Sequence, residues 1–164
     1  MKAYLLLEDG TLFTGRSIGA VKEVVSEIVF NTSMTGYLEV LTDPLIGNYG
    51  VCREDMESGR AWPDALIVRE LAELASNFRS RETLQQFLVA ENVPGIEGID
   101  TRALTKLLRE RGTMNGFLTT NPDFDREDAL RRMKEYQVLG AVARVSCKEK
   151  YVIPGKGKKV AIID

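Results

Sequence analysis

The sequence contains no histidine and only two cysteines among its 164 residues. Nucleophilic sites of the Ser-His-Asp and Cys-His types use an imidazole as the base, so the lack of histidine argues against both classes. It also excludes zinc sites that use histidine, and Cys52 and Cys147 are too distant in the sequence to suggest another kind of zinc site. We interpret both as structural or incidental thiols in a reducing compartment, without a disulfide framework.

The sequence also lacks long apolar runs and a large excess of one charge. No segment approaches the roughly 20 apolar residues that cross a bilayer, and the apolar run at residues 4–7 is too short for a signal peptide. The net charge of −2 gives no chain-wide attraction to nucleic acid or to an anionic membrane. We therefore expect a cytoplasmic protein whose partners include neither nucleic acid nor a membrane.

The residues that are present are typical of one folded domain with a single core, since 44% are hydrophobic and 28% are charged. Residues 4–7 and 11–14 flank Asp9-Gly10, a strong turn signal, and so predict a hairpin. Asp9 is therefore interpreted as a turn residue and not as a catalytic carboxylate. Apolar or β-branched runs predict further extended segments at residues 24–30, 38–41, 63–69, 96–99 and 115–120.

Three later segments have the periodicity and the end signals of helices. The first is predicted at residues 80–92 with Ser80 as N-cap. The second is predicted at residues 101–111, with Asp100 as N-cap and Gly112 just after its end. The side chains expected to face the core are Leu84, Phe87 and Leu88 in the first helix, Ala103, Leu104, Leu107 and Leu108 in the second, and Ala129, Leu130 and Met133 in a third helix that follows Asp125. This order of elements predicts a mixed α/β fold with a β-rich N-terminal half and flanking helices.

The helix predicted at residues 101–111 carries basic side chains mostly away from its apolar stripe. They are Arg102, Lys106, Arg109 and Arg111. One interpretation is a solvated helix face, and the other is a surface that meets phosphate or the acidic groups of a partner.

The C-terminal segment has a linker composition at residues 154–159 and the pattern of a buried strand at residues 160–164. Its Gly-Lys-Gly-Lys-Lys run lacks the spacing of a phosphate-binding loop and precedes a strand instead of following one. We therefore interpret it as a solvated linker.

Four long motifs occur in a characteristic order. They are FNTSMTGYLEVLTDP (residues 30–44), LIGNYGV (45–51), ASNFRS (75–80) and IDTRALTKLLRERGTMNG (99–116). In these motifs the chain resembles the N-terminal domain of the small, glutamine-using subunit of carbamoyl-phosphate synthetase. The leading LLLEDGTLFTGRSIGA and the closing VSCKEKYVIPGKGKKVAIID resemble it as well, so the resemblance spans essentially the whole chain.

The resemblance implies a swivelling β/β/α-type domain at residues 1–152. Residues 153–164 would then be a linker and the first strand of a class I glutamine amidotransferase domain. In the family that second domain holds the Cys-His-Glu triad that hydrolyses glutamine, and its ammonia passes to the large subunit. The large subunit uses bicarbonate, ATP and magnesium to make carbamoyl phosphate for pyrimidine and arginine synthesis. We therefore expect the present chain to have no catalytic residue, cofactor or metal of its own, and to seat the amidotransferase domain on the large subunit.

The resemblance also implies an interface with the large subunit. Short polar side chains beside a glycine can hold an irregular loop rigid for docking, and an internally satisfied connection is the alternative. The expected interface residues are Asn31, Thr32, Met34, Thr35, Gly36, Tyr37, Asp100 and Arg102.

One departure from the family concerns the junction of Pro44 and Leu45. Similar sequences carry about a dozen residues here, beginning with Ser-Tyr and ending with Thr-Tyr-Pro. That stretch contains the serine through which this domain of the family contacts glutamine, so no glutamine-binding residue is assigned to this chain. A natural deletion, an engineered deletion and a disordered loop left out of a longer chain are the alternative explanations.

An alternative function from another class is a stand-alone binding module. It would use the basic face of residues 101–111 for an anionic ligand or nucleic acid. Salt-sensitive retention on heparin would distinguish this module from a domain that serves in assembly.

Overall fold

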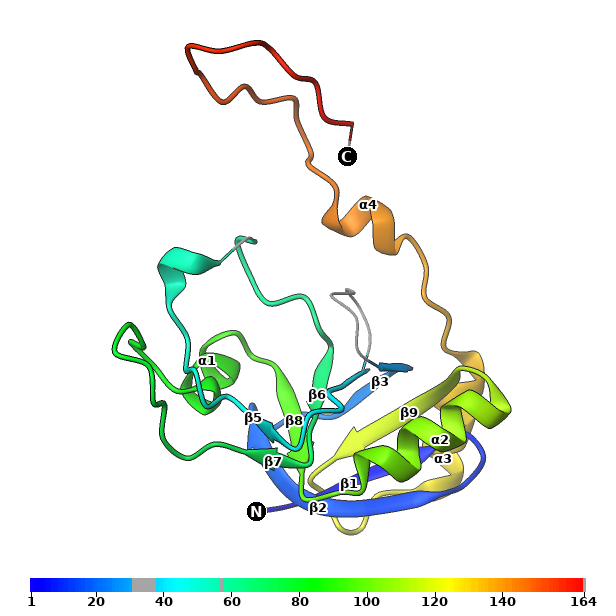
Figure 1. The fold of residues 1–164 in the computed structure, drawn as a ribbon. Coiled ribbons are helices and arrows are strands. Elements are labelled where there is room, and N and C mark those ends of the chain that lie inside the picture. The colour runs from blue at the N-terminus through cyan, green and yellow to red at the C-terminus, as the bar shows by residue number, and fades with distance from the viewer. Residues whose placement is uncertain (31–37, 57, 164) are drawn as a thin grey trace.

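The computed structural model describes residues 1–30, 38–56 and 58–163 of the chain. In this part of the chain seven strands form a closed barrel in the order β1-β2-β8-β6-β4-β3-β9 (Figure 1). The barrel strands are β1 (Lys2–Leu7), β2 (Leu12–Gly19), β3 (Val24–Phe30), β4 (Leu38–Val40), β6 (Ala65–Ile67), β8 (Pro94–Glu97) and β9 (Met114–Thr119). Neighbours within β3-β4-β6-β8 pair in parallel, and the remaining pairs are antiparallel. The prediction of a mixed α/β class with a β-rich N-terminal half is confirmed, whereas the swivelling arrangement stays a prediction.

The first hairpin forms as its turn residues predict. Gly10 has a φ of 87°, which a glycine adopts without strain, and the Asp9 carboxylate accepts a hydrogen bond of 2.8 Å from the Thr11 amide. The pairing runs from Leu6 opposite Leu12 to Lys2 opposite Arg16. The carboxylate of Asp9 also lies 2.5 Å from the Arg111 guanidinium, so it has a structural role in the turn.

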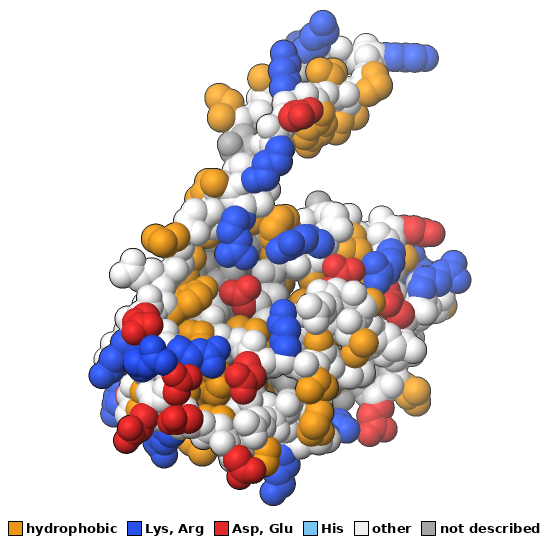
Figure 2. Space-filling view, turned by 180° about the vertical axis from the view of Figure 1, so that it is seen from behind, with side chains coloured by type: hydrophobic (Ala, Val, Ile, Leu, Met, Phe, Trp, Pro, Cys, Tyr) orange, Lys and Arg blue, Asp and Glu red, His pale blue; other side chains and the backbone are white. Residues whose placement is uncertain are grey.

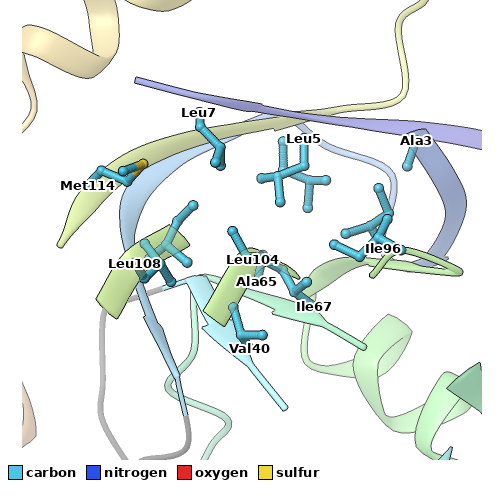
Figure 3. Close-up of a cluster of buried hydrophobic side chains, with 13 residues drawn as sticks. Ala3, Leu5, Leu7, Val40, Ala65, Ile67, Ile96, Leu104, Leu108 and Met114 are labelled. Carbon is cyan, nitrogen blue, oxygen red and sulfur yellow. The ribbon is translucent and has the colours of Figure 1, made fainter. Parts of the chain in front are cut away.

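The barrel interior is filled by alternate side chains of its strands, as the two-residue period of a strand requires. Figure 3 shows Leu5 and Leu7 of β1 pointing toward Leu104 and Leu108 of α2 (Thr101–Arg111). Strand and helix side chains therefore form one hydrophobic cluster. Its other fully or nearly fully buried members are Ala3, Ile28, Val40, Ala65, Ile67, Ile96, Ile99, Met114 and Leu118.

Helix α2 has the predicted bounds, and its ends have the predicted signals. The Asp100 carboxylate accepts hydrogen bonds from the amides of Arg102 (3.1 Å) and Ala103 (3.0 Å), and Gly112 follows the helix with a φ of 90°. The prediction that Ala103 faces the core is wrong, because its side chain is exposed.

The buried face of α2 consists of Thr101, Leu104, Thr105 and Leu108, and Leu107 is only partly buried. The barrel therefore meets positions i, i+3, i+4 and i+7 of the helix. Thr105 can be buried there because its hydroxyl donates a hydrogen bond of 2.8 Å to the Thr101 carbonyl one turn earlier.

Helix α1 (Leu84–Ala90) starts later than predicted, and its N-cap is Thr83 instead of Ser80. Thr83 and Gln86 form a capping box, in which each side chain bonds the other residue's amide. Residues 81 and 82 cannot be helical because their backbone bonds Val51, through Arg81 N to Val51 O (3.0 Å) and Val51 N to Glu82 O (2.9 Å). The helix packs against β2 through a second hydrophobic cluster. The buried residues of this cluster are Ile18, Leu66, Val68, Leu71, Leu88 and Val93.

Helix α3 (Arg126–Glu135) forms after Asp125, as predicted, and that residue caps it. Ala129 and Met133 are buried against Leu6 and Phe117, and Leu130 is partly buried in the same cluster. The short elements β5 (Leu45–Ile46), β7 (Glu70–Leu71), the 3₁₀ turn Arg53–Asp55 and α4 (Ala141–Val145) were not predicted from the sequence. Strands β5 and β7 pair in parallel beside the barrel.

The C-terminal segment after α4 leads away from the barrel (Figure 1). Residues 160–163 form no strand, so the predicted strand at residues 160–164 is not seen in the described part of the chain, and Asp164 lies outside it. A strand needs a hydrogen-bonded neighbour, and these residues pair with none of the strands described. Figure 2 shows basic and hydrophobic side chains along this projecting segment. The helices in the described part of the chain are all too short or too polar to span a bilayer.

Candidate partner interface

Six of the predicted interface residues lie outside the described part of the chain. They are Asn31, Thr32, Met34, Thr35, Gly36 and Tyr37. The structure does place the two ends of their segment, since Phe30 ends β3 and Leu38 begins β4. These strands are parallel neighbours in the barrel, with Ile28 opposite Leu38 and Phe30 opposite Val40. The predicted interface segment therefore connects adjacent strands of the barrel.

The remaining two predicted interface residues, Asp100 and Arg102, lie at the start of α2. The Asp100 carboxylate is occupied by the two amides that it caps, so its contribution in this structure is to hold the helix. Arg102 is exposed, and no ion pair to it is found among residues 1–30, 38–56 and 58–163. Of the two side chains, Arg102 is the one that is available to a partner.

The structure brings α2 to the edge of the predicted interface segment. The guanidinium carbon of Arg109 lies 5.3 Å from the centre of the Phe30 ring, and Phe30 is the last residue before the segment. A cation over an aromatic ring at this distance is attracted to it. Sequence analysis placed Arg109 on the basic helix face, but nothing local relates it to Phe30, so only the structure shows this contact.

We define the basic stripe as Arg102, Lys106 and Arg109. All three side chains are exposed, and their spacing of four and then three residues places them on one face of α2. Lys106 lies 3.8 Å from Glu110, a solvent-exposed pair that contributes little to stability. The fourth basic residue, Arg111, belongs to a different contact because it pairs with Asp9.

A half-buried carboxylate lies on β4, directly after the predicted interface segment. Glu39 pairs in register with Val29 of β3 and Leu66 of β6. Desolvation by burial raises the pKa of the Glu39 carboxyl above its ordinary value. No cation of the described residues forms an ion pair with it, so ionisation of Glu39 opposes folding.

Glu39→Gln is expected to raise the free energy of unfolding at pH 7.5 by less than about 1 kcal/mol, because solvent still screens half of the group. The pKa of Glu39 is higher in the folded than in the unfolded state. The contribution of Glu39 to the free energy of unfolding should therefore fall as the pH rises from its unfolded pKa through its folded pKa. The Glu39→Gln variant should lack this contribution. Urea unfolding of both proteins at pH 4 and pH 7.5 measures this, with the exposed Glu149→Gln as control. An equal gain at both pH values would contradict the assignment.

A second carboxylate that sequence analysis missed, Glu97, holds the barrel to β7. It is 5% exposed, forms an ion pair with Arg16 and accepts a hydrogen bond of 2.9 Å from the Leu71 amide. The sequence predicted only a short extended segment here, since nothing local shows which partners Glu97 will meet.

A buried polar group anchors the start of the C-terminal segment. The Ser26 hydroxyl, fully buried in β3, donates to the Asp64 carboxylate at 2.8 Å and lies 3.1 Å from the Tyr136 hydroxyl. The Asn115 amide side chain donates to the carbonyls of Met133 (2.8 Å) and Tyr136 (3.3 Å). These bonds fix the point at which the chain leaves α3.

The described residues do not assemble a metal site, because no three potential Cys, Asp or Glu ligands come together among them. Cys52 is half-buried, Cys147 is exposed, and neither takes part in a disulfide.

The junction of Pro44 and Leu45 lies at the surface. Asp43, Pro44 and Leu45 are exposed, while Leu41 and Ile46 on either side pack partly against the second cluster. Extra residues at this point could begin and end in solvent without disturbing the core.

Comparisons with known proteins cover most or all of this chain. The family described as "Carbamoyl-phosphate synthase small chain, CPSase domain" matches residues 5–118, which run from β1 into β9. The chain belongs to this family. The match confirms the resemblance that the four sequence motifs indicated.

Individual members of the small-chain family are similar over the whole chain. The carbamoyl phosphate synthase small chain of Clostridium perfringens is 47% identical over 176 positions, which cover 100% of this chain and 50% of the relative. That of Listeria monocytogenes is 44% identical, covering 99% and 48%. The pyrimidine-specific small chain of Bacillus subtilis is 42% identical, covering 100% and 48%. The chain thus spans about half the length of these relatives.

These alignments are longer than the chain itself. An alignment of 176 positions to a chain of 164 residues leaves at least 12 positions without a counterpart in this chain. The resemblance to the family implies about a dozen additional residues after Pro44, which is a similar number.

Proposed function

We propose that this chain is the assembly and positioning domain of the small subunit of a cytoplasmic, glutamine-dependent carbamoyl-phosphate synthetase. The complete small subunit would hydrolyse glutamine and supply ammonia to the large subunit, which would make carbamoyl phosphate with bicarbonate, ATP and magnesium. Residues 1–152 would form the domain, and residues 153–164 would lead into the amidotransferase domain. The proposed pathways are pyrimidine and arginine biosynthesis.

The observation that carries this proposal is the family match over residues 5–118, which contain most of the barrel, α2 and the residues of the predicted interface. An assembly role is supported by the absence of histidine from the sequence, since glutamine hydrolysis in the family uses a Cys-His-Glu triad. It is also supported by the contact of Arg109, on the exposed basic face of α2, with Phe30, the last described residue before the predicted interface segment.

The stand-alone anion-binding module has less support. The basic face of α2 includes Glu110, 3.8 Å from Lys106, and the chain carries a net charge of −2. Both features weaken attraction to the regularly spaced phosphates of nucleic acid.

The test is a binding titration of the purified chain against the large subunit from the same organism. We expect a complex with a dissociation constant of about 1 µM or tighter, typical of a specific protein interface. We also expect no ammonia release when the chain alone is incubated with glutamine. A titration without complex formation would contradict the assembly role, and ammonia release that depends on the chain would contradict its non-catalytic nature.

A further inference from the structure

Helix α4 buries none of its side chains, in contrast to α1, α2 and α3. Its Val142 and the preceding Leu139 are each 75% exposed. A helix of five residues is not stable in water by itself, since helices shorter than about 12 residues are marginal there. Apolar side chains also gain free energy when they leave water. In this arrangement α4 therefore lacks the packing that would stabilise it.

A hollow of about 620 Å³ lies between α4 and the barrel. On the side of the barrel it is lined by Glu8, Glu27 and Met114, and on the opposite side by Ala141 and Val142 of α4. Figure 1 shows α4 at the end of an extended connection, apart from the barrel strands. The hollow is thus the space that α4 enters if it moves toward β3 and β9.

The two sides of the hollow carry opposite charges that are not paired. In the part of the chain that the structure describes, the Glu27 carboxylate has neither an ion pair nor a hydrogen bond. The Arg144 guanidinium likewise forms no ion pair with a described carboxylate. Arg144 follows Ala141 by three residues, so the two share one side of α4. A guanidinium and a carboxylate pair through charge-assisted hydrogen bonds.

The connection before α4 has the features of a hinge. The chain is held up to Tyr136, whose carbonyl accepts a hydrogen bond from the Asn115 side chain (3.3 Å) and whose hydroxyl lies 3.1 Å from that of Ser26. Residues 137–139 form neither helix nor strand, and no backbone hydrogen bond ties them to the described residues. Gly140 follows with a φ of 65°, which a glycine adopts without strain.

Residues 141–148 can move about this hinge as one unit. The Lys148 amine folds back and donates a hydrogen bond to the Ala143 carbonyl, so the chain just after α4 stays with the helix. Cys147 lies within this unit and is exposed. A label on its thiol therefore reports where α4 lies.

We propose that α4 is a strap that closes onto the hollow about the hinge at Gly140. In the closed arrangement Arg144 pairs with Glu27, and Val142 enters the hollow beside Met114. Closure turns the direction in which the C-terminal segment leaves the barrel. It depends on contacts within this chain alone, so it occurs whether or not a large subunit binds.

The experiment measures the paramagnetic broadening that a nitroxide on Cys147 causes in the NMR spectrum of the chain. Cys52→Ser removes the other cysteine, so the label attaches at one position. The readout is the intensity of the amide signal of Asn115, which lines the hollow, with the label oxidised and then reduced. Circular dichroism of each variant checks that it is folded.

Three changes are compared in this labelled background. Arg144→Glu reverses the charge of the strap, and Glu27→Lys combined with Arg144→Glu exchanges the two charges. Lys134→Glu is the matched control, because Lys134 is an exposed residue of α3 without an ion pair in the described ranges. It also lines a different hollow, on the outer side of α3.

We expect the Asn115 signal to be broadened at least about twofold less in Arg144→Glu than in the unaltered strap, because attraction is replaced by repulsion. The exchanged pair should recover most of the broadening, and Lys134→Glu should leave it unchanged. Glu27→Gln, which keeps the shape of the side chain, should reduce the broadening as Arg144→Glu does. High salt should reduce the broadening of the unaltered strap.

Two results would overturn the strap. One is equal broadening in the unaltered chain and in Arg144→Glu, which would mean that this charge does not draw α4 to the barrel. The other is a loss in Arg144→Glu that the exchanged pair does not recover while both proteins are folded, since Arg144 would then not act through Glu27. Neither result affects the proposed function, which is tested by complex formation with the large subunit.

Discussion

Leu104→Ala is expected to lower the free energy of unfolding by about 3–4 kcal/mol. Leu104 is 0% exposed and belongs to the cluster that joins α2 to the barrel interior. Removing its side chain leaves a cavity between a helix and several strands, and a closed barrel can collapse onto that cavity only partly. Urea unfolding followed by circular dichroism, with and without the substitution, measures the loss.

Lys106→Ala is the matched control, because Lys106 is on the same helix and is exposed. Alanine favours the helix, so the change in the free energy of unfolding should stay within about 0.5 kcal/mol. A loss in Leu104→Ala no larger than that of the control would mean that α2 does not pack on the barrel as described.

Gly95→Ala is expected to destabilise the protein by about 3 kcal/mol. A Cβ atom at this position would lie 2.5 Å from the Leu66 carbonyl oxygen and 2.8 Å from Cγ1 of Ile18. Gly95 pairs with both residues, since β8 lies between β6 and β2 in the barrel. The obstacle on one side is backbone, which cannot move without lengthening the hydrogen bonds between β6 and β8.

Gly59→Ala provides the control for this substitution. A Cβ atom there would meet nothing within 4 Å, and the residue has no positive φ. The expected change is within about 0.5 kcal/mol, with a gain in stability if the alanine restricts the unfolded chain. If thermal unfolding showed equal midpoints for the two variants, the close approach of β6 and β8 at Gly95 would be refuted.

The sequence predicted those features whose causes lie within a few residues. The Asp9-Gly10 turn and the Asp100 cap each involve hydrogen bonds across two or three positions, so the residues that form them are adjacent in the sequence. The strand segments were likewise visible as apolar and β-branched runs. The family was visible because its motifs are contiguous and long.

Contacts with distant segments explain the two errors in the helix predictions, which concern the N-cap of α1 and the buried face of α2. Ser80 and Thr83 are both good N-caps, and the backbone bonds of residues 81 and 82 to Val51 decided in favour of Thr83. In α2 the apolar pattern suggested that Ala103 faces the core, but the rotation of the helix against the barrel buried Thr105 instead. Neither outcome can be read from the local pattern, because each depends on a segment elsewhere in the chain.

The class of fold, the Asp9-Gly10 turn, the Asp100 cap and the family could be predicted from the sequence, because they depend on local hydrogen bonding, on periodicity and on contiguous motifs. Three contacts became known only from the folded chain: β1 closes the barrel by pairing with β9, the buried Glu97 carboxylate pairs with the exposed Arg16, and the Arg109 guanidinium lies over the Phe30 ring. These contacts join residues far apart in the chain, and they form only when the whole barrel has brought its strands into register.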